Sequence, residues 1–595
     1  MEQAKKNYKR LNIVRMVSCI LVLLYHLNIV KGGFLAVCTF FVLSGYLRFK
    51  SAFSKPTFSI SKYYSKRIKK IYLPLLIIIF LTIIVAKQIE SITWVNLKPE
   101  SISALLGYNN FWQLEANLDY FTRHVNSPFM HFWYIAILIQ FDLIFPLFYF
   151  ILNKLDETID ENASIKVVLG LSILSIIIFI TLGFTKGLMF AYYHTLARVF
   201  SILLGGLLAL IHCKFGNSVT KIFYRQHSLL CSLYLIVLIV MSLFNTENTI
   251  INLILLIIST IVSVRLIDYS IVSNNRRMIY DENKCVSFIS KISYEIYLVQ
   301  YPIIFFMQNI NINSTLKATT IIIITIILSY LLNELLRFKS KKRLIKIIQL
   351  IIILIILIIG ITLLLLEKDH TNEMNELQQK LEENSTIMEQ NNNHFLENAD
   401  NFQQETETVI VKDETTADEI VETTEEIVEP DPNLEQIVHN LPVVGVGDSV
   451  LLGAVRDLHK QFPNGYFDGK VSRNLKGGED VLKDLINKGK LGDTVIVALA
   501  NNGEFSSKRI AQFLQVLGDR QIYWVNAVGA DDPEYNARFE EFAKDYPNVH
   551  IVDWYSTAKP EYLYADKVHP KEGIGTAAYA QVIFDTIYKN YRQSN

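Results

Sequence analysis

Long uninterrupted apolar segments dominate the first 366 residues and constrain the fold more than any other feature of the chain. The run Ile347–Leu366, for example, contains no charged residue. A helix needs about 20 apolar residues to cross the hydrocarbon core of a bilayer. Because a backbone in lipid must satisfy its own hydrogen bonds, such segments form helices. The sequence therefore predicts a multi-span α-helical membrane domain.

Taking about 20 residues as the crossing length, we count about eleven spans, near residues 11–30, 33–49, 71–90, 130–152, 164–184, 189–211, 228–245, 248–267, 292–310, 316–335 and 346–366. The first span is not a cleavable signal peptide. It keeps Arg15 and His26 inside its apolar run, and another span comes directly after it.

The distribution of basic residues between the spans predicts the orientation of the chain. The N-terminal cluster at residues 5–10 and the loops 50–70 and 336–345 are rich in Lys and Arg, whereas opposite loops such as 91–129 are poorer. Basic loops stay in the cytoplasm. We therefore expect a multi-pass protein of the cell membrane with a cytoplasmic N-terminus. An odd number of spans would place the C-terminal domain outside the cell.

Changes in composition divide the chain into four segments. We expect an acyltransferase-like membrane domain at 1–345, an additional membrane helix at 346–366, an acidic extracytoplasmic linker at 367–440 and a folded domain at 441–595. Within the linker, residues 371–435 are rich in acids and poor in apolar side chains. Such a segment buries too little apolar area to fold alone, so we interpret it as an extended tether. Its first turns have helical spacing, so a short coiled coil, a solvated helix and a disordered strip are the alternatives.

Beyond residue 441, short apolar runs alternate with amphipathic segments. The expected strands are 443–447, 466–471, 494–500, 521–527 and 549–553, and the expected helices are 451–461, 476–488, 505–517, 534–546 and 574–592. This alternation predicts a flavodoxin-like α/β domain, in which helices cover both faces of a parallel sheet. Ligand groups in such a domain lie on the loops after the carboxyl ends of the strands.

Three residue types needed for acyl transfer occur on those loops. Gly447-Asp448-Ser449 follows the first expected strand, and Asp566 and His569 lie three apart near the C-terminus. In nucleophilic acyl transfer, an imidazole takes the proton of a serine hydroxyl and a carboxylate holds the imidazole in the right tautomer. A turn serine and a surface histidine are the alternative interpretation.

These segments resemble the SGNH hydrolase family, in its first block at Ser449, its third at Asn502-Gly503 and its last at Asp566 and His569. The resemblance implies that Ser449 is the nucleophile, His569 the base and Asp566 the acid that orients it. It also implies oxyanion or substrate contacts from Asn502, Ser472 and Arg473. Two positions depart from the family pattern, because Ser472 and Ala500 replace glycines.

The membrane half resembles the membrane-bound acyltransferase family 3 over residues 8–335. The matching segments are Arg15 and His26, Gly32-Gly33-Phe34, Phe40-Phe41, Ser44-Gly45-Tyr46-Leu47, Tyr64 to Arg67, Pro74, His131 to Tyr134, Gln140-Phe141, Arg198, Leu203-Leu204-Gly205, Ser293-Tyr294 and Tyr297-Leu298. Its fusion to an exported SGNH domain resembles the layout of Gram-positive peptidoglycan O-acetyltransferases. Gln300 stands where many relatives carry a histidine, so a proton-relay role at that position does not transfer.

A separation of eleven residues returns to the same face of a helix, so Arg15 and His26 are expected to face one cavity. The resemblance implies that His26 is a general base near a thioester and that Tyr134 is a relay for the acyl group. Donor-binding cations are the remaining expectation, and these are Arg15, Lys66, Arg67 and Arg198. The alternative is that Arg15 snorkels to the interface and that His26 is tied to a neighbouring helix.

The expected activity is O-acetyl transfer from cytoplasmic acetyl-CoA, through Ser449, to hydroxyls of a cell-wall glycan such as the muramic acid of peptidoglycan. Acetyl-CoA is a co-substrate, and neither a resident cofactor nor a metal is expected. The formal net charge of zero argues against a nucleic-acid partner. Three alternatives stay open: acetylation of another wall polysaccharide, an exported esterase, and a transporter with an exported binding module.

Overall fold

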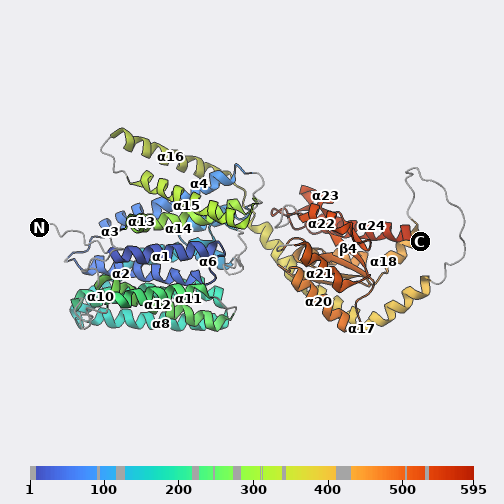
Figure 1. Ribbon diagram of the computed structural model, residues 1–595, viewed down its shortest axis with the longest axis horizontal. Coiled ribbons are helices and arrows are strands. Elements are labelled where there is room, and N and C mark those ends of the chain that lie inside the picture. Colours follow the sequence, from blue (N-terminus) through green and yellow to red (C-terminus); the bar gives the residue numbers. More distant parts are fainter. Residues whose placement is uncertain are drawn as a thin grey trace. The chain divides into compact units, whose positions relative to one another are not determined.

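The computed structural model describes residues 9–594 except 56, 90–93, 116–126, 217–226, 245–247, 273–282, 309, 311, 338–342, 411–430, 503–505 and 530–534. The chain divides into two compact units, Met1–Lys368 and Asp369–Asn595, which are described separately. Both are drawn in Figure 1.

The first unit consists of helices. They are α1 (Lys9–His26), η1 (Gly33–Ala36), α2 (Val37–Phe53), α3 (Ile60–Arg67), η2 (Ile68–Tyr72), α4 (Leu73–Ala86), α5 (Leu97–Leu106), α6 (Asn109–Glu115), η3 (Met130–Phe132), α7 (Trp133–Thr158), α8 (Ala163–Thr185), α9 (Leu188–Tyr193), α10 (Thr195–Lys214), α11 (His227–Leu243), α12 (Thr249–Val272), α13 (Lys284–Lys291), α14 (Ser293–Met307), α15 (Ser314–Leu336) and α16 (Arg343–Leu366).

Among the described residues, eight helical stretches are long and apolar enough to cross a membrane, compared with the eleven spans expected. Helices also form at the other three expected positions, but they are shorter or more charged. Helix α1 has 18 residues and carries three Lys or Arg residues, α11 has 17 residues and α14 has 15. A helix of 15 residues is only about 22 Å long, less than the roughly 30 Å of the hydrocarbon core.

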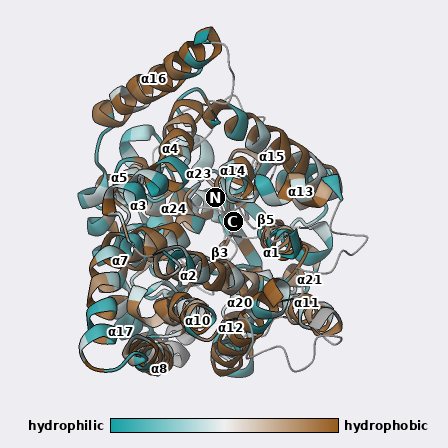
Figure 2. Ribbon diagram, turned by 90° about the vertical axis from the view of Figure 1, so that its left-hand side faces the viewer, coloured by the Kyte–Doolittle hydropathy of each residue, from teal (hydrophilic) through white to brown (hydrophobic). Residues whose placement is uncertain are grey.

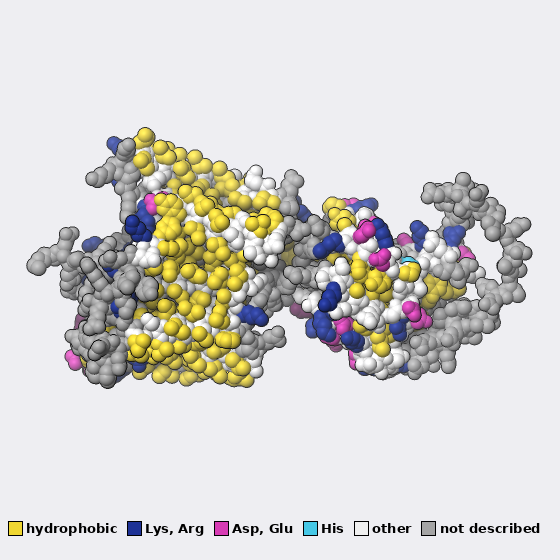
Figure 3. Space-filling model, viewed as in Figure 1, with side chains coloured by type: hydrophobic (Ala, Val, Ile, Leu, Met, Phe, Trp, Pro, Cys, Tyr) yellow, Lys and Arg dark blue, Asp and Glu magenta, His cyan; other side chains and the backbone are white. Residues whose placement is uncertain are grey.

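The outer surface of the first unit is apolar. Ile177 of α8, Ile327 of α15 and Ile355 of α16 are each about half exposed, and these helices are coloured as largely hydrophobic in Figure 2. In Figure 3 hydrophobic side chains form a broad band over this unit. Small polar side chains such as Ser172 and Ser175 of α8 are instead buried. This distribution is typical of a helical bundle in lipid.

Helices α2 and α10 approach each other through two glycines. A Cβ added at Gly45 would lie 1.9 Å from the carbonyl oxygen of Ile202, and one at Gly205 would lie 2.0 Å from that of Val42. Neither position can therefore accept a side chain without separating the helices. Close packing through small residues is a common way for membrane helices to associate.

The second unit contains five strands: β1 (Val444–Gly447), β2 (Tyr466–Gly469), β3 (Thr494–Ala498), β4 (Gln521–Val525) and β5 (Val549–Val552). All pairs are parallel, in the order β2-β1-β3-β4-β5. The parallel sheet confirms the prediction, and its strand order is the flavodoxin-like one. The helices are α17 (Thr371–Ile410), α18 (Pro432–His439), α19 (Ser449–Gln461), α20 (Leu475–Asn487), α21 (Ser507–Leu517), α22 (Tyr535–Ala543), α23 (Trp554–Thr557) and α24 (Ile574–Ser594), with the short turn η7 (Pro560–Tyr562).

Alternate residues of each strand point to opposite faces of the sheet, and each face has its own core. Val495 and Val497 of β3 pack with side chains of α20, α21 and α22. Ile496 and Ala498 of the same strand pack with side chains of α19 and α24. The sheet is thus covered on both sides, which explains why its strands read as continuous apolar runs.

The segment interpreted from the sequence as an extended tether is different in the structure. Residues 371–410 form the single helix α17, and residues 411–430 lie outside the described part of the chain. One stripe of α17 carries the buried side chains Leu377, Met388 and Phe395. Met388 belongs to the core on one face of the sheet, and Phe395 belongs to the core on the other face. The tether interpretation was therefore wrong for this helix. Most of the described acidic residues of α17 lie on its solvated face, and in the overall composition the acids outweigh the few residues of the apolar stripe.

Candidate active site

Ser449 lies at the point where β1 ends and α19 begins, and its side chain is 8% exposed. The preceding residue, Asp448, caps the helix, because its Oδ1 accepts a hydrogen bond of 2.8 Å from the backbone N–H of Val450. The serine is therefore the first residue of a helix N-terminus. The backbone N–H groups and dipole there favour negative charge.

The structure brings Ser449, His569 and Asp566 together, although 120 residues separate the serine from the histidine. Oδ2 of Asp566 lies 2.6 Å from Nδ1 of His569, and Oγ of Ser449 lies 2.8 Å from Nε2. The carboxylate accepts a hydrogen bond from the Nδ1–H group, so Nε2 is free to accept the hydrogen bond from the serine hydroxyl. This is the tautomer that a general base requires.

Asp566 is held ionised by its own loop. Its Oδ1 accepts hydrogen bonds from the backbone N–H groups of Val568 and His569, at 2.9 and 3.1 Å. Burial alone would raise the pKa of Asp566, but the hydrogen bonds and the charge of His569 outweigh it and leave the pKa below its usual value. The loop makes this turn through Lys567, whose φ is +59°. We call residues 563–572 the Asp-His loop.

Asn502 lies beside Asp448. Its Nδ2 donates a hydrogen bond of 3.0 Å to Oδ2 of Asp448, the residue that precedes Ser449. Burial raises the pKa of Asp448 to about 6, although this amide and the N–H of Val450 oppose the rise. Gly503, which completes the third sequence block, lies outside the described residues.

Ser472 and Arg473 follow β2. Ser472 has a φ of +58°, in the left-handed region that favours glycine. This backbone explains why the family pattern has a glycine there. Arg473 donates through Nη2 to Oδ1 of Asp468 at 2.6 Å and through Nη1 to the carbonyl oxygen of Gly447 at 3.2 Å. In the structure its guanidinium connects the ends of two strands.

In the first unit, a series of ring contacts connects His26 with Tyr134. His26 is buried at the end of α1, where its ring centroid lies 5.0 Å from that of Tyr301 and 6.2 Å from that of His131. His131 in turn lies 5.1 Å from Tyr297, which lies 5.3 Å from Tyr134. Arg15 and His26 both belong to α1, so a single helix carries both residues at the predicted separation of eleven.

The cations expected to bind the donor occupy different surroundings. Lys66 is exposed on α3, whereas Nε of Arg67 lies 3.4 Å from Oδ1 of Asp142. Arg198 is fully buried among aromatic rings, with its guanidinium carbon 4.9 Å from the Tyr192 centroid. One of its nitrogens is 3.5 Å from Sγ of Cys38. Arg198 thus lies among aromatic rings and one thiol, whereas Arg67 lies beside a carboxylate and the Tyr63 ring.

A buried ion pair that was not predicted from the sequence joins Arg48 of α2 and Asp142 of α7. Nε and Nη2 of the arginine donate to the two carboxylate oxygens at 2.6 and 2.8 Å. The hydroxyl of Tyr63 donates to the same carboxylate. Two opposite charges inside apolar spans were the available signal, because intramembrane charges pair with one another.

Known proteins are similar to this chain both in its membrane half and over nearly its full length. The family model described as "Acyltransferase domain" matches residues 8–334. O-acetyltransferase OatA of Staphylococcus aureus (strain MRSA252) is 28% identical over 613 residues, covering 96% of this chain and 95% of that protein. The same protein of strain NCTC 8325 is 28% identical over 612 residues, with the same coverage.

Among solved structures, the C-terminal catalytic domain of Streptococcus pneumoniae peptidoglycan O-acetyltransferase A is similar to part of the chain. It is 24% identical, with a TM-score of 0.23, and the match covers 26% of this chain and 94% of that domain.

Proposed function

This chain belongs to the acyltransferase 3 family and is an O-acetyltransferase, and from that premise we propose its substrates, orientation and catalytic residues. In this proposal, acetyl groups from cytoplasmic acetyl-CoA cross the membrane to Ser449 and then pass to hydroxyls of cell-wall glycan. The acceptor that we favour is the muramic acid of peptidoglycan. The observation that carries the proposal is the hydrogen-bonded series from Ser449 through His569 to Asp566.

The chemistry at Ser449 follows from this arrangement in two steps. His569 takes the hydroxyl proton while Oγ bonds to the acetyl carbonyl carbon, and the departing group leaves with a proton from the imidazolium. A glycan hydroxyl then attacks the acetyl-serine, again giving its proton to His569, and Oγ leaves protonated. We assign oxyanion stabilisation to the backbone N–H of Ser449 and the amide of Asn502, where one such donor is worth roughly 3 kcal/mol.

On the donor side, we assign the general base to His26 and the acyl relay to Tyr134. The ring contacts through His131 and Tyr297 support a path between the two. Arg15, Lys66 and Arg67 are assigned to the phosphates of the donor, a task suited to clustered cations. The fourth expected cation, Arg198, lies in its aromatic cage and is assigned there to the packing of α10.

The orientation requires an odd number of crossings. We propose that α1, α11 and α14 cross together with the eight longer helices, which gives eleven. The N-terminus is then cytoplasmic and Ser449 extracellular. We assign residues 1–345 to the acyltransferase domain, 346–366 to an additional membrane helix and 441–595 to the SGNH-like domain, with α17 as part of the exported unit.

The test uses cells that lack the protein and are complemented with variants. Ser449→Ala and His26→Ala are each expected to abolish O-acetylation of the cell wall, measured by mass spectrometry of muropeptides. Ser449→Ala removes the nucleophile for the glycan step, whereas His26→Ala stops donor use. Full acetylation with either variant, expressed at the normal level, contradicts the scheme.

A separate measurement distinguishes transfer from hydrolysis. The purified protein is given an acetyl ester with and without a chitooligosaccharide. Transfer predicts acetylated oligosaccharide, and its absence despite ester turnover identifies an esterase.

A further inference from the structure

Helix α17 contacts the Asp-His loop, helix α19, which begins at Ser449, and the edge strand β2 of the sheet. On the edge strand β2, Nδ2 of Asn392 donates to the carbonyl oxygen of Phe467 at 2.7 Å, and the N–H of Phe467 donates to Oδ1 of Asn392 at 3.1 Å. On α19, Nδ2 of Asn384 donates to the carbonyl oxygens of Leu452 and Gly453, at 3.1 and 2.9 Å. These bonds fix the position of α17 on the second unit.

The first turn of α17 reaches the Asp-His loop through Glu373. Oε1 of Glu373 accepts a hydrogen bond of 3.1 Å from the backbone N–H of Ala565 and lies 3.6 Å from Nζ of Lys571. Ala565 precedes Asp566 directly, and Lys571 follows His569 by two residues. One carboxylate therefore contacts the chain on both sides of the residues that orient and activate Ser449.

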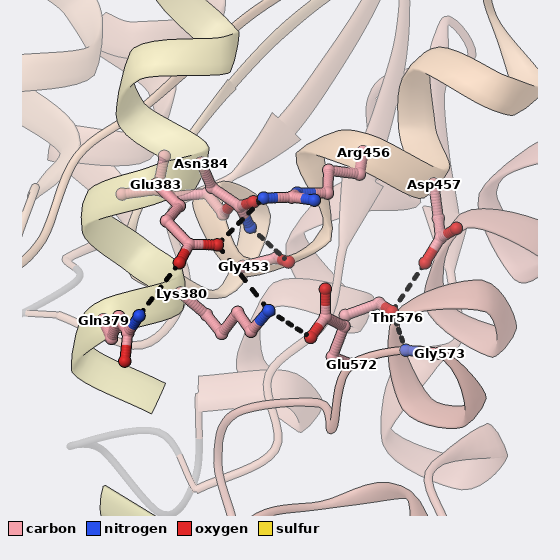
Figure 4. A network of polar contacts seen from close by, with 11 residues as sticks. Gln379, Lys380, Glu383, Asn384, Gly453, Arg456, Asp457, Glu572, Gly573 and Thr576 are labelled. Carbon is pink, nitrogen blue, oxygen red and sulfur yellow. Dashed lines mark hydrogen bonds and ion pairs between the residues drawn. The ribbon is translucent and has the colours of Figure 1, made fainter. Parts of the chain in front are cut away.

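A second connection lies two turns further along α17, as Figure 4 shows. Nζ of Lys380 is 3.0 Å from Oε2 of Glu572, the last residue of the Asp-His loop. Glu383 is 3.1 Å from Nη2 of Arg456 on α19. Between these contacts lies a cavity of about 220 Å³, lined in part by Asn384 and Thr576. Here α17 approaches the loop through polar bridges, and farther along Met388 and Phe395 add apolar contacts to those of the two asparagines.

We propose that Glu373 is a positioning residue for acyl transfer, acting through the Asp-His loop. It holds the loop so that Nε2 of His569 remains within hydrogen-bond distance of Ser449. A misplacement of about 1 Å can cost two orders of magnitude in rate, so a bond at this loop bears on turnover. The inference rests on the proposed roles of Ser449, His569 and Asp566.

The experiment measures hydrolysis of p-nitrophenyl acetate by the full-length protein purified in detergent. Glu373→Ala removes the acceptor for the Ala565 N–H, and Glu373→Asp withdraws it by one methylene while keeping the charge. Both are expected to lower kcat about tenfold with little change in KM, as for the loss of one hydrogen bond to a charged group. Glu373→Gln keeps an acceptor oxygen at the same reach and is expected to retain most of the kcat.

The matched control is Glu389→Ala, which removes an exposed carboxylate from the same helix and is expected to leave kcat unchanged. Melting temperatures identify any variant that unfolds, and Glu373→Asp then carries the test. If both Glu373→Asp and Glu373→Ala match the control in kcat while Ser449→Ala is inactive, the positioning role is overturned alone. If Ser449→Ala keeps full activity, the proposed nucleophile is overturned and the inference with it.

Discussion

Two residues near Ser449 adopt a backbone conformation that side chains other than glycine seldom take. Lys567 and Ser472 have φ values of +59° and +58°. At Lys567 the turn lets Asp566 accept two backbone N–H groups while its other oxygen faces His569. At Ser472, by contrast, no described hydrogen bond of the side chain offsets the conformation. The conformation of Lys567 thus supports the active site, whereas that of Ser472 could be relieved by a substitution that stabilises the fold.

We expect Ser472→Gly to stabilise the second unit by about 1 kcal/mol, because glycine adopts the left-handed region without the Cβ clash. Differential scanning calorimetry of the purified protein measures this as a higher melting temperature. Ser507→Gly, in the first turn of α21, is the control and is expected to lower stability. An unchanged or lower melting temperature for Ser472→Gly contradicts the prediction.

The buried carboxyl of Asp448 predicts a pH dependence of stability. The unfolded chain ionises this group near its ordinary pKa of 3.8, and the folded chain near 6. Between these values the folded state binds more protons, so the contribution of Asp448 to stability is greatest below pH 4 and is lost as the pH rises towards 6. Asp448→Asn should remove this contribution from the pH profile of unfolding. The same profile in Asp480→Asn, where the carboxylate is exposed, should match the parent.

At the scale of elements, the ion pair of Arg48 and Asp142 connects α2 with α7 inside the bundle. Both side chains are nearly inaccessible, with 1% and 9% of their surfaces exposed. Removing one partner would leave a buried charge without compensation. The Asp142 carboxylate also accepts a hydrogen bond from the Tyr63 hydroxyl and lies near Arg67. Both of these residues belong to α3, so the ion pair connects α3 with the core of the bundle.

We expect Asp142→Ala to destabilise the first unit by about 3–5 kcal/mol, the usual cost of breaking a buried pair. The double variant Arg48→Met with Asp142→Leu should recover much of that loss. Unfolding of the detergent-solubilised protein followed by calorimetry gives both values. A double variant as unstable as Asp142→Ala would show that the cost comes from packing and not from the unpaired charge.

Elements with a clear hydrophobic period were predictable from the sequence. The strands from 444 to 552 lie within the predicted ranges, because parallel strands buried on both faces read as apolar runs. The loops after those strands carried Ser449 and His569, so their proximity followed from topology. Helix α17 was not predictable in the same way, since its contacts with the sheet depend on two asparagines and a narrow stripe. The two charges in apolar spans indicated a buried pair, but not that Arg48 would meet Asp142, 94 positions away.

At the scale of the whole molecule, the number of crossings decides which side of the membrane each active group faces. Eight crossings would return the C-terminal unit to the side of the N-terminus, and eleven place it on the opposite side. The three helices that decide the parity are those with more charge or less length, α1, α11 and α14. His26 lies on the first of them, which gives that helix a chemical as well as a topological part in the proposal.

The orientation is tested by labelling intact cells with a membrane-impermeant maleimide. In a background in which the five cysteines are replaced, Lys544→Cys in the second unit is expected to react. Lys154→Cys lies near the C-terminal end of α7, which eleven crossings place on the cytoplasmic side, and should react only after the cells are permeabilised. Labelling of Lys154→Cys alone in intact cells would reverse the orientation.

The asparagine of α17 that pairs with Phe467 has a practical consequence for protein production. A fragment that starts after residue 430 lacks α17 and therefore exposes the free edge of β2. Strands of other molecules can pair with such an edge, so we expect this fragment to aggregate. A gene fragment that starts at Asp369 keeps this edge occupied. Crystallisation and inhibitor screening should therefore use the longer expression boundary.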